Sequence, residues 1–509
     1  MKTPDTFSLW RNGEENESNS SASSSLMAVL ATVLVVSIVF YFFRRTKNGA
    51  YLLPPGPRGL PLLGSLPFLR SDLHVYFAEL ARTYGPVMSL RLGAKLCEAL
   101  RDQDVVFANR DVPMVGFVYS YGGKNLAWAP YGPHWRMLRK VSARELFNPA
   151  TIDSLSIPRQ DEIRRMVEEI RRKAGQSVNL RELVFAVTMK LIAVMLWGGS
   201  LPQKGEEGDA VWREIGNAVD KIVSMSAVPN ISDFYPALAW LDLQGLVRRM
   251  RRLCSVLDHI LNSIIEERLM MMESCREGDP AAAVDKKNRD FLQVLLDLVQ
   301  NPDPQGPMTM EHTKALLLDL VAGGMDTMST TVEWAMAELL NDPERMRTAQ
   351  HEIAAVVGKG SAVEEVHLPR LRYLDAVVRE TLRLHPTLRL HPVVPLLVPR
   401  CPSSTCTVGG FRIPEGTNVL VNVWEIHRDP RIWEDASKFK PERFLSEAGR
   451  TDLPRHFAGE RMVMFILASL LHSADWALPE GGAAALDLNE KFGIVMRKEK
   501  ALIAIPSTR

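Results

Sequence analysis

Cysteine is scarce in this chain, with five in 509 residues, at positions 97, 254, 275, 401 and 406. An odd, scattered set does not predict a disulfide framework and favours a reducing compartment for the bulk of the chain. Cys401 and Cys406 are close together, but no second pair or histidine cluster accompanies them, so the pattern does not indicate a four-ligand zinc site. An excess of one charge is also lacking, because Lys+Arg 61 against Asp+Glu 60 leaves +1. A nucleic-acid partner is therefore not expected.

What the chain does contain is typical of a globular protein with a large core: 46% hydrophobic and 24% charged residues. The length allows more than one domain, although large single-domain enzymes reach this size. Helical periodicity predicts helices over residues 163–173, 247–272, 336–357 and 371–384. Strand-like runs are fewer, at 87–92, 393–398 and 418–423. The pattern predicts a mainly α domain with a small β part and no solenoid repeat.

The N-terminal region carries one long uncharged apolar run, residues 26–43. About 18 residues at 1.5 Å each reach about 27 Å, close to the thickness of a bilayer core. Basic residues follow at Arg44, Arg45 and Lys47, while acidic residues precede the run, so the positive-inside rule places the C-terminal part in the cytosol. The alternative is a cleaved signal peptide, but the run lacks a basic n-region and a well-placed cleavage site.

These features divide the chain into four parts. Residues 1–25 form a polar tail, 26–43 a transmembrane anchor and 44–60 a basic, proline-rich hinge, followed by one domain over 61–509. The hinge contains Leu53-Pro54-Pro55-Gly56-Pro57, and prolines at this density favour an extended, semi-rigid chain. It would hold the domain at a fixed tilt against the membrane.

A carboxylate and a guanidinium lie three residues apart at Glu380 and Arg383, on one face of a predicted helix. Such a pair is usually a solvated surface pair, but apolar neighbours here indicate burial, and a buried carboxylate needs its full set of donors. Arg443, in Pro441-Glu442-Arg443-Phe444, would supply a second guanidinium. The Glu-x-x-Arg pair is unspecific alone and becomes specific with this later motif.

A second constellation interrupts an apolar helical segment with Gly323 and Gly324, followed by Met325, Asp326 and Thr327. Each mid-helix glycine costs about 1 kcal/mol relative to alanine, a cost kept where a backbone must approach something closely or a helix must open. An acid and a hydroxyl at such an opening would hold water and relay protons. The alternative is a loose helix with a polar kink.

A third constellation is Trp135-Arg136-Met137-Leu138-Arg139, which places an indole donor and a guanidinium one turn apart. This pair suits an anion such as a carboxylate. Taken by itself, it is more typical of a basic helix that faces a membrane or a partner.

Together these motifs resemble the plant microsomal cytochrome P-450 monooxygenases, in particular the group that oxidises flavonoids and terpenoids, such as flavonoid 3'-hydroxylases. The resemblance runs from the apolar run to Pro506 and includes His427-Arg428-Asp429-Pro430. It implies the cytochrome P-450 fold, haem b on a cysteine thiolate, an endoplasmic reticulum location, an apolar small-molecule substrate and electrons from NADPH through a reductase.

The resemblance also implies roles for individual residues. Asp326 and Thr327, beside Gly323 and Gly324, would manage oxygen and proton delivery. Trp135 and Arg139 would meet a haem propionate. Glu380, Arg383 and Arg443 would form the structural triad behind the haem.

The chain departs from the family at the haem ligand. The family pattern F-x-x-G-x-R-x-C-x-G belongs after Arg443, but Phe457-Ala458-Gly459 runs directly into Glu460-Arg461-Met462, and no cysteine occurs after Cys406. The gap falls near residues 455–460. His456 lies beside it and is a weak alternative iron ligand, since histidine would lack the thiolate push.

Two further departures accompany the missing loop. The segment near residues 97–100 lacks residues that the family pattern has there. In addition, Thr381–Pro386 is repeated as Thr387–Pro392. We hypothesise splicing, gene-model or genomic damage, which sequencing of the full transcript tests. Two functions are therefore kept: a membrane-anchored monooxygenase, and a catalytically incompetent relative without a thiolate haem, which the chain as written favours.

Overall fold

The structure is a computed structural model. It describes residues 53–60, 63–92, 95–98, 105–199, 201, 205–277, 290–301, 307–358, 360–386, 395–445, 458–479 and 486–508, together with Thr32. The rest of the predicted anchor, His456 and the second copy of the repeated hexapeptide lie outside the described residues. Among the helices that are described, none combines the length and the apolar character needed to cross a bilayer.

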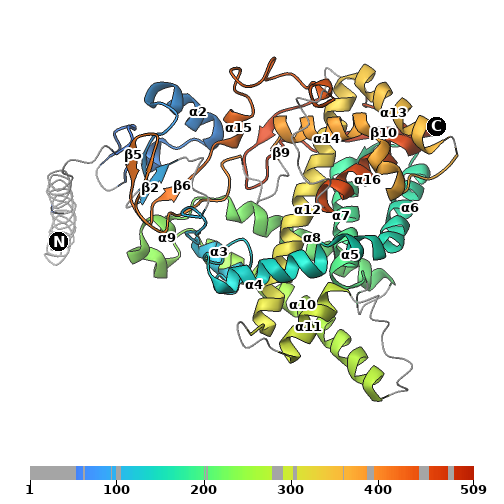
Figure 1. Cartoon of the computed structure of the whole chain (residues 1–509), viewed down its shortest axis with the longest axis horizontal. Helices are drawn as coiled ribbons and strands as arrows, with labels where there is room; N and C mark the ends of the chain where they lie inside the picture. The colour runs from blue at the N-terminus through green and yellow to red at the C-terminus, as the bar shows by residue number, and fades with distance from the viewer. Residues whose placement is uncertain are drawn as a thin grey trace, which may run out of the picture.

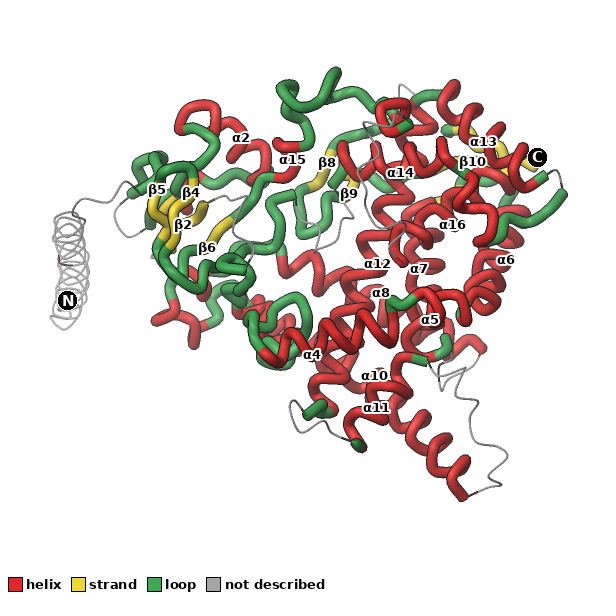
Figure 2. Tube along the Cα trace, viewed as in Figure 1, coloured by secondary structure: helices red, strands yellow, loops and turns green. Residues whose placement is uncertain are grey.

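Helices make up most of the molecule (Figure 2). In chain order they are η1 (Leu66–Phe68), α2 (Leu73–Tyr84), α3 (Met114–Tyr119), α4 (Pro133–Val141), η2 (Ser142–Leu146), α5 (Pro149–Ser154), α6 (Ser156–Arg172), α7 (Leu180–Trp197), α8 (Gly205–Ser226), α9 (Ile231–Phe234), η3 (Pro236–Leu241), α10 (Leu246–Glu277), α11 (Phe291–Gln300), α12 (Met310–Asn341), α13 (Pro343–Val357), η5 (Glu365–Arg370), α14 (Arg372–Leu384), α15 (Val423–Ile426), η6 (Pro441–Phe444) and α16 (Ala458–Ser473).

The strands are short. They are β1 (Leu90–Leu92), β2 (Lys95–Glu98), β3 (Val178–Asn179), β4 (Cys406–Val408), β5 (Phe411–Ile413), β6 (Asn418–Val419), β7 (Ala474–Ala477), β8 (Glu490–Lys491), β9 (Arg497–Lys498) and β10 (Ile503–Thr508). In the first sheet β2 lies between antiparallel β1 and parallel β6. In the second, β10 lies between β3 and β7, and β4–β5 and β8–β9 form two antiparallel ribbons. The mainly α fold with small sheets is confirmed.

The core is built around α12, which crosses the centre of the molecule beside α7 (Figure 1). Both helices are buried on nearly every side, as expected for helices surrounded by others. Thr309 starts α12 with a capping box, its side chain accepting from the backbone of His312 while His312 accepts from Thr309. α14 and α16 pack on the second half of α12. The helix that carries the glycine pair is therefore held on several sides.

Some predicted boundaries were wrong. The helix predicted over 336–357 is two helices, because Pro343 cannot continue α12 and Asp342 instead caps α13 by accepting from the amide of Arg345. The strand predicted over 393–398 is a turn over its described residues 395–398. The strand predicted from Asn418 is only β6, since α15 begins at Val423. The chain still forms a strand beside the shortened segment near residues 97–100, since β2 pairs with β1.

Candidate functional site

Glu380, Arg383 and Arg443 form one buried cluster between α14 and η6. Arg383 donates to Glu380 through Nε (2.8 Å) and Nη2 (2.9 Å), and Arg443 Nε donates to the same carboxylate at 3.1 Å. The backbone amide of Lys440 adds a fourth donor at 2.7 Å. Glu380 is 0% exposed, so this carboxylate obtains from the protein the donors that water would otherwise supply.

Arg383 also fixes the chain that precedes η6. Its Nη1 donates to the carbonyls of His427 and Ala436, both at 2.7 Å, and its Nη2 donates to that of Lys438 at 3.2 Å. Trp433 lies under the guanidinium, 5.3 Å from its carbon to the ring centre. One helical side chain thereby orders a long irregular segment, which is a structural function rather than a chemical one.

The glycine pair lies inside an unbroken helix, so of the two explanations for the pair, close approach and a local opening, the opening is absent over Gly323 and Gly324. Gly324 is explained by close approach, because a Cβ there would lie 2.7 Å from Ile192 Cδ1 on α7. A Cβ on Gly323 would meet nothing within 4 Å. The Thr327 hydroxyl donates to the carbonyl of Gly323 at 2.8 Å, turning back onto its own helix. The first glycine therefore leaves space beside a hydroxyl.

Asp326 is held by an ion-pair network. Its Oδ1 forms a 2.5 Å ion pair with Arg497 Nη2 on β9, and Arg497 also pairs with Asp220 on α8. Burial raises the pKa of the Asp326 carboxyl, an effect that Arg497 opposes. The side chain of Asp220 is 45% exposed and that of Asp326 is 3% exposed, so the three groups connect the surface with the helix interior.

Trp135 and Arg139 are adjacent on α4, but they do not present two free donors. Trp135 Nε1 donates to the carbonyl of Leu126 at 3.1 Å. The guanidinium carbon of the exposed Arg139 lies 5.3 Å from the indole centre. In this structure the pair is a cation–π contact whose indole donor is already used.

A different arginine pair has an unmet donor. Asn109 and Cys401 form an isolated β-bridge, which brings the neighbouring Arg110 and Arg400 together. Burial and the like charge of Arg400 lower the pKa of Arg110 to about 10. Arg110 Nη1 is buried and has no hydrogen-bond partner among the described residues. A half-buried guanidinium with one unmet donor, beside a second cation, suits an anion.

Asp319, two turns before Thr327 on α12, holds the loop that precedes α4. It accepts from Asn125 Nδ2 at 3.1 Å and from the amide of Ala127 at 3.0 Å. Burial raises the pKa of the Asp319 carboxyl to about 7. This carboxyl is thus poised to change charge near neutral pH while it connects α12 to the segment beside Trp135.

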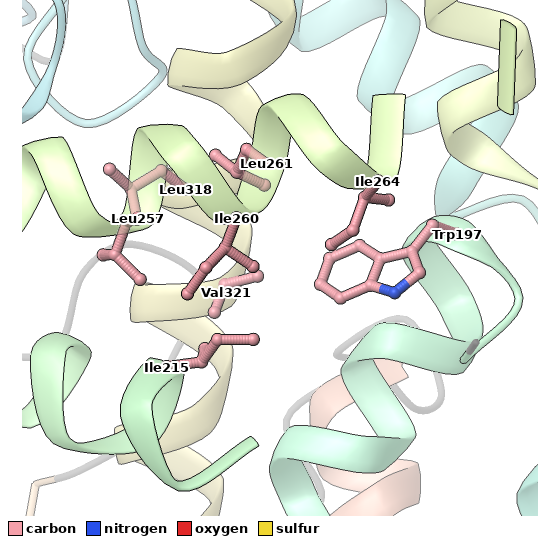
Figure 3. Close-up of a pocket in the computed structure, with 8 residues that line it drawn as sticks. All are labelled: Trp197, Ile215, Leu257, Ile260, Leu261, Ile264, Leu318 and Val321. Atoms are coloured by element: carbon pink, nitrogen blue, oxygen red, sulfur yellow. The ribbon is translucent and has the colours of Figure 1, made fainter. Parts of the chain in front are cut away.

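A small apolar cavity lies between α7, α8, α10 and α12 (Figure 3). Its volume is about 20 Å³, and its lining is entirely hydrocarbon apart from the indole of Trp197. This is room for a few atoms, far less than a drug-sized ligand requires. The cavity is a packing void rather than a substrate site.

The comparisons with known proteins decide the family. The sequence model of cytochrome P-450 matches residues 54–459. This chain belongs to the cytochrome P-450 family. It is 36% identical to a flavonoid 3'-monooxygenase of Crocosmia x crocosmiiflora, over 92% of this chain and 95% of that protein. It is 35% identical to a geraniol 8-hydroxylase of Catharanthus roseus, over 92% and 96%. A zebra fish cytochrome P-450 solved with progesterone aligns with a TM-score of 0.68 at 25% identity, covering 85% of this chain and 99% of that one.

These relatives confirm the resemblance to plant cytochromes P-450 that act on flavonoids and terpenoids. The family match ends at residue 459, the second residue of α16, beside the place where the family loop is missing from the sequence. The fold and the lineage are therefore established over almost the whole chain.

The family implies a haem, and the residues present provide only part of a haem-binding site. Arg110 and Arg400 suit the carboxylates at the edge of a porphyrin. The iron side lacks its sulfur, because no cysteine follows Cys406. Burial raises the pKa of the Cys254 thiol on α10 to about 12, which keeps it protonated. No group of three or more metal-ligating side chains occurs in the described part of the chain.

Arg110, Arg400 and Asp319 were missed by sequence reasoning. No local sequence pattern indicates these residues, because the residue that lies beside Arg110 is about 290 residues away in the chain and the one that Asp319 binds is about 190 residues away. The available signal was the Phe107-Ala108-Asn109-Arg110 stretch, an isolated cation after apolar residues, which has many structural explanations.

Proposed function

We propose that this protein is a plant monooxygenase that hydroxylates a small apolar or phenolic metabolite of the flavonoid or terpenoid type. Electrons would come from NADPH through a reductase. The observation that carries the proposal is the similarity of nearly the whole chain to flavonoid and terpenoid hydroxylases alike. A bound haem would supply the oxygen chemistry, and Arg110 with Arg400 would hold its carboxylate edge.

The chain's own residues support parts of this function. The glycine–threonine turn of α12 offers space and a hydroxyl beside Gly323. Asp326, Arg497 and Asp220 connect that helix with the surface and suit proton transfer. The triad of Glu380, Arg383 and Arg443 would keep the segment before η6 in place.

A second function is favoured by one observation, the absence of any cysteine after Cys406. Under this proposal the chain as written is a cytochrome P-450 scaffold without a thiolate haem, and it does not hydroxylate. The scaffold would persist because its buried ion pairs form without a cofactor.

A carbon monoxide spectrum separates the two functions. The full chain is expressed with haem supplied, reduced and treated with carbon monoxide, and haem content is measured in parallel. A thiolate-type Soret band supports the first function and refutes the second. A matched chimera carries the cysteine loop of the Crocosmia relative before Glu460. A band in the chimera alone supports the second function, and its absence from both contradicts a haem-competent scaffold.

We also propose a single-pass location in the endoplasmic reticulum membrane, with residues 26–43 as the anchor and the domain in the cytosol. Alkaline carbonate extraction of microsomes tests it. The full chain is expected in the pellet and a variant lacking residues 1–43 in the supernatant. Release of the full chain contradicts the anchor.

A further inference from the structure

His385, the residue that caps the C-terminus of α14, is buried between two carboxylates. Its Nε2 lies 2.8 Å from Oε1 of Glu338 on α12, and its Nδ1 lies 2.9 Å from Oε1 of Glu490 on β8. The ring stacks on the indole of Trp334, with the ring centres 3.7 Å apart and the planes 4° from parallel. One imidazole therefore connects the end of α14 with α12 and with the β8–β9 ribbon, which lies between α15 and α14 in Figure 2.

The two contacts of this ring fix the number of protons in the cluster. An ionised carboxylate only accepts hydrogen bonds, whereas a neutral imidazole has one donor and one acceptor. Both contacts of His385 are hydrogen bonds only when the cluster holds one proton more than a neutral imidazole and two carboxylates carry. A single metal ion cannot use both nitrogens of one ring, so this arrangement is a proton site and not a metal site.

The balance of charge places the extra proton on the imidazole. Arg428 Nη2 and the indole Nε1 of Trp424, both near α15, donate to the Glu490 carboxylate at 2.9 Å each. Although burial raises it, the histidines and Arg428 around this carboxyl hold the pKa of Glu490 well below its usual range. Arg428 neutralises one of the two carboxylates, so a charged His385 neutralises the other and leaves no buried charge without a partner.

The same side of α12 contacts the β8–β9 ribbon at two further points. Trp334 Nε1 donates to the carbonyl of Met496 at 2.9 Å, and Asp326 forms its ion pair with Arg497. Asp326, Trp334 and Glu338 are separated by eight and four residues, so they project from one side of the helix. Three buried contacts therefore attach the ribbon to α12 along about three helical turns.

The position of Arg497 depends on what holds the ribbon. β8 and β9 have two residues each, and they pair Glu490 with Lys498 and Lys491 with Arg497. A two-stranded ribbon is at best marginally stable by itself, so the side-chain contacts of Glu490 stabilise its position. Burial raises the pKa of the Asp326 carboxyl and Arg497 opposes this effect, so a displaced ribbon would change the charge of Asp326 as well.

We propose that His385 is a positioning residue that, as an imidazolium, holds the β8–β9 ribbon on α12 and so keeps Arg497 on Asp326. The inference rests on the proton connection in the proposed function and adds the residue that maintains it. His385 acts through Glu490 and the ribbon, without contact with Asp326 itself. A histidine that only filled space would need no more than its stacking on Trp334, and phenylalanine would replace it.

The protonation state is tested by nitrogen NMR of the full chain in detergent at neutral pH, with the 11 histidines labelled with ¹⁵N. The signal that disappears in variants of His385 belongs to this ring, and both of its nitrogens are expected to carry a proton. In Glu338→Gln one carboxylate is removed, and the ring is expected to become neutral. A neutral ring in the wild type, or a ring that keeps both protons in Glu338→Gln, overturns the proposal.

The hold on the ribbon is tested by amide hydrogen exchange over residues 490–498. His385→Phe keeps a flat ring for Trp334 but has no donors, and exchange is expected to become at least about tenfold faster, because hydrogen bonds to charged groups are lost. His385→Arg supplies a planar cation with donors on several sides and is expected to restore slow exchange. Carbon NMR of the Asp326 carboxyl is expected to show a higher pKa in His385→Phe than in the wild type.

A matched control is His472→Phe on α16, which removes a histidine that contacts the carbonyl of Gly358. It is expected to leave both the ribbon exchange and the pKa of Asp326 unchanged. Unchanged ribbon exchange in His385→Phe, or an arginine variant that exchanges as fast as the phenylalanine variant, overturns the proposal. None of these measurements needs a haem, so a failure here is distinct from a negative carbon monoxide spectrum.

Discussion

Replacing Glu380 by glutamine is expected to be among the most damaging single changes in this chain. Glu380 is fully buried and accepts four hydrogen bonds, three of them from the guanidinium groups of Arg383 and Arg443. Glutamine keeps the size but leaves the buried charge of Arg383 without its counterion. Breaking one side of a buried ion pair costs about 3–5 kcal/mol. Total stability is typically about 5–15 kcal/mol, so the loss is a large fraction of it.

The assay is urea unfolding of the full chain in detergent, followed by far-ultraviolet circular dichroism. A matched control is Arg164→Gln, which breaks an exposed i,i+3 pair with Asp161 and is expected to change stability by less than about 1 kcal/mol. The double variant E380L/R383L is expected to lose less than the sum of its single variants, since neither charge is left alone. A loss in E380Q no larger than that of the control would refute the reasoning.

The remaining predictions concern α12 and the arginine pair. Burial raises the pKa of Asp319 from 3.8 to about 7, so the folded state holds one more proton between these values and stability falls as pH rises through that window. In D319N this contribution disappears, so the difference in unfolding free energy between the wild type and the variant is expected to be larger at pH 5 than at pH 8. Urea unfolding measures this difference, and an equal value at both pH values would contradict the argument. Gly324→Ala is expected to lower stability by about 1–3 kcal/mol, because the added methyl group would contact Ile192. Gly323→Ala has free space and is expected to raise stability by up to about 1 kcal/mol. Equal effects of the two variants in thermal unfolding would contradict the packing argument. Arg110→Gln is expected to stabilise the haem-free chain by about 1–3 kcal/mol, because an unsatisfied buried donor is removed, and to weaken porphyrin binding in absorption titrations. Destabilisation of the haem-free chain would show that Arg110 already has a partner.

Local pattern was enough for much of the fold. The apolar period of residues 371–384 predicted α14. The Glu-x-x-Arg spacing with the later Pro-Glu-Arg-Phe motif predicted that Glu380, Arg383 and Arg443 lie together. The break at Asp342 was missed because helical spacing continues on both sides of Pro343. Gly324 was noticed, but its explanation needed Ile192 on another helix. The Arg110–Arg400 pair depends on a β-bridge between distant segments, which no local pattern encodes.

The buried carboxylate of Glu380 also has a consequence for the order of folding. Arg383 is its neighbour on α14, but Lys440 and Arg443 come about 60 residues later in synthesis. Until that segment is present, the Glu380–Arg383 pair on α14 lacks two of its hydrogen-bond donors, and burying it early would leave a charge without a partner. Closing so long a loop is slow relative to helix formation, so the second half of α12 and α14 have to wait for η6 before they pack. A nascent or truncated chain that stops before residue 440 would expose that apolar surface, which makes it a natural substrate for chaperones and proteases.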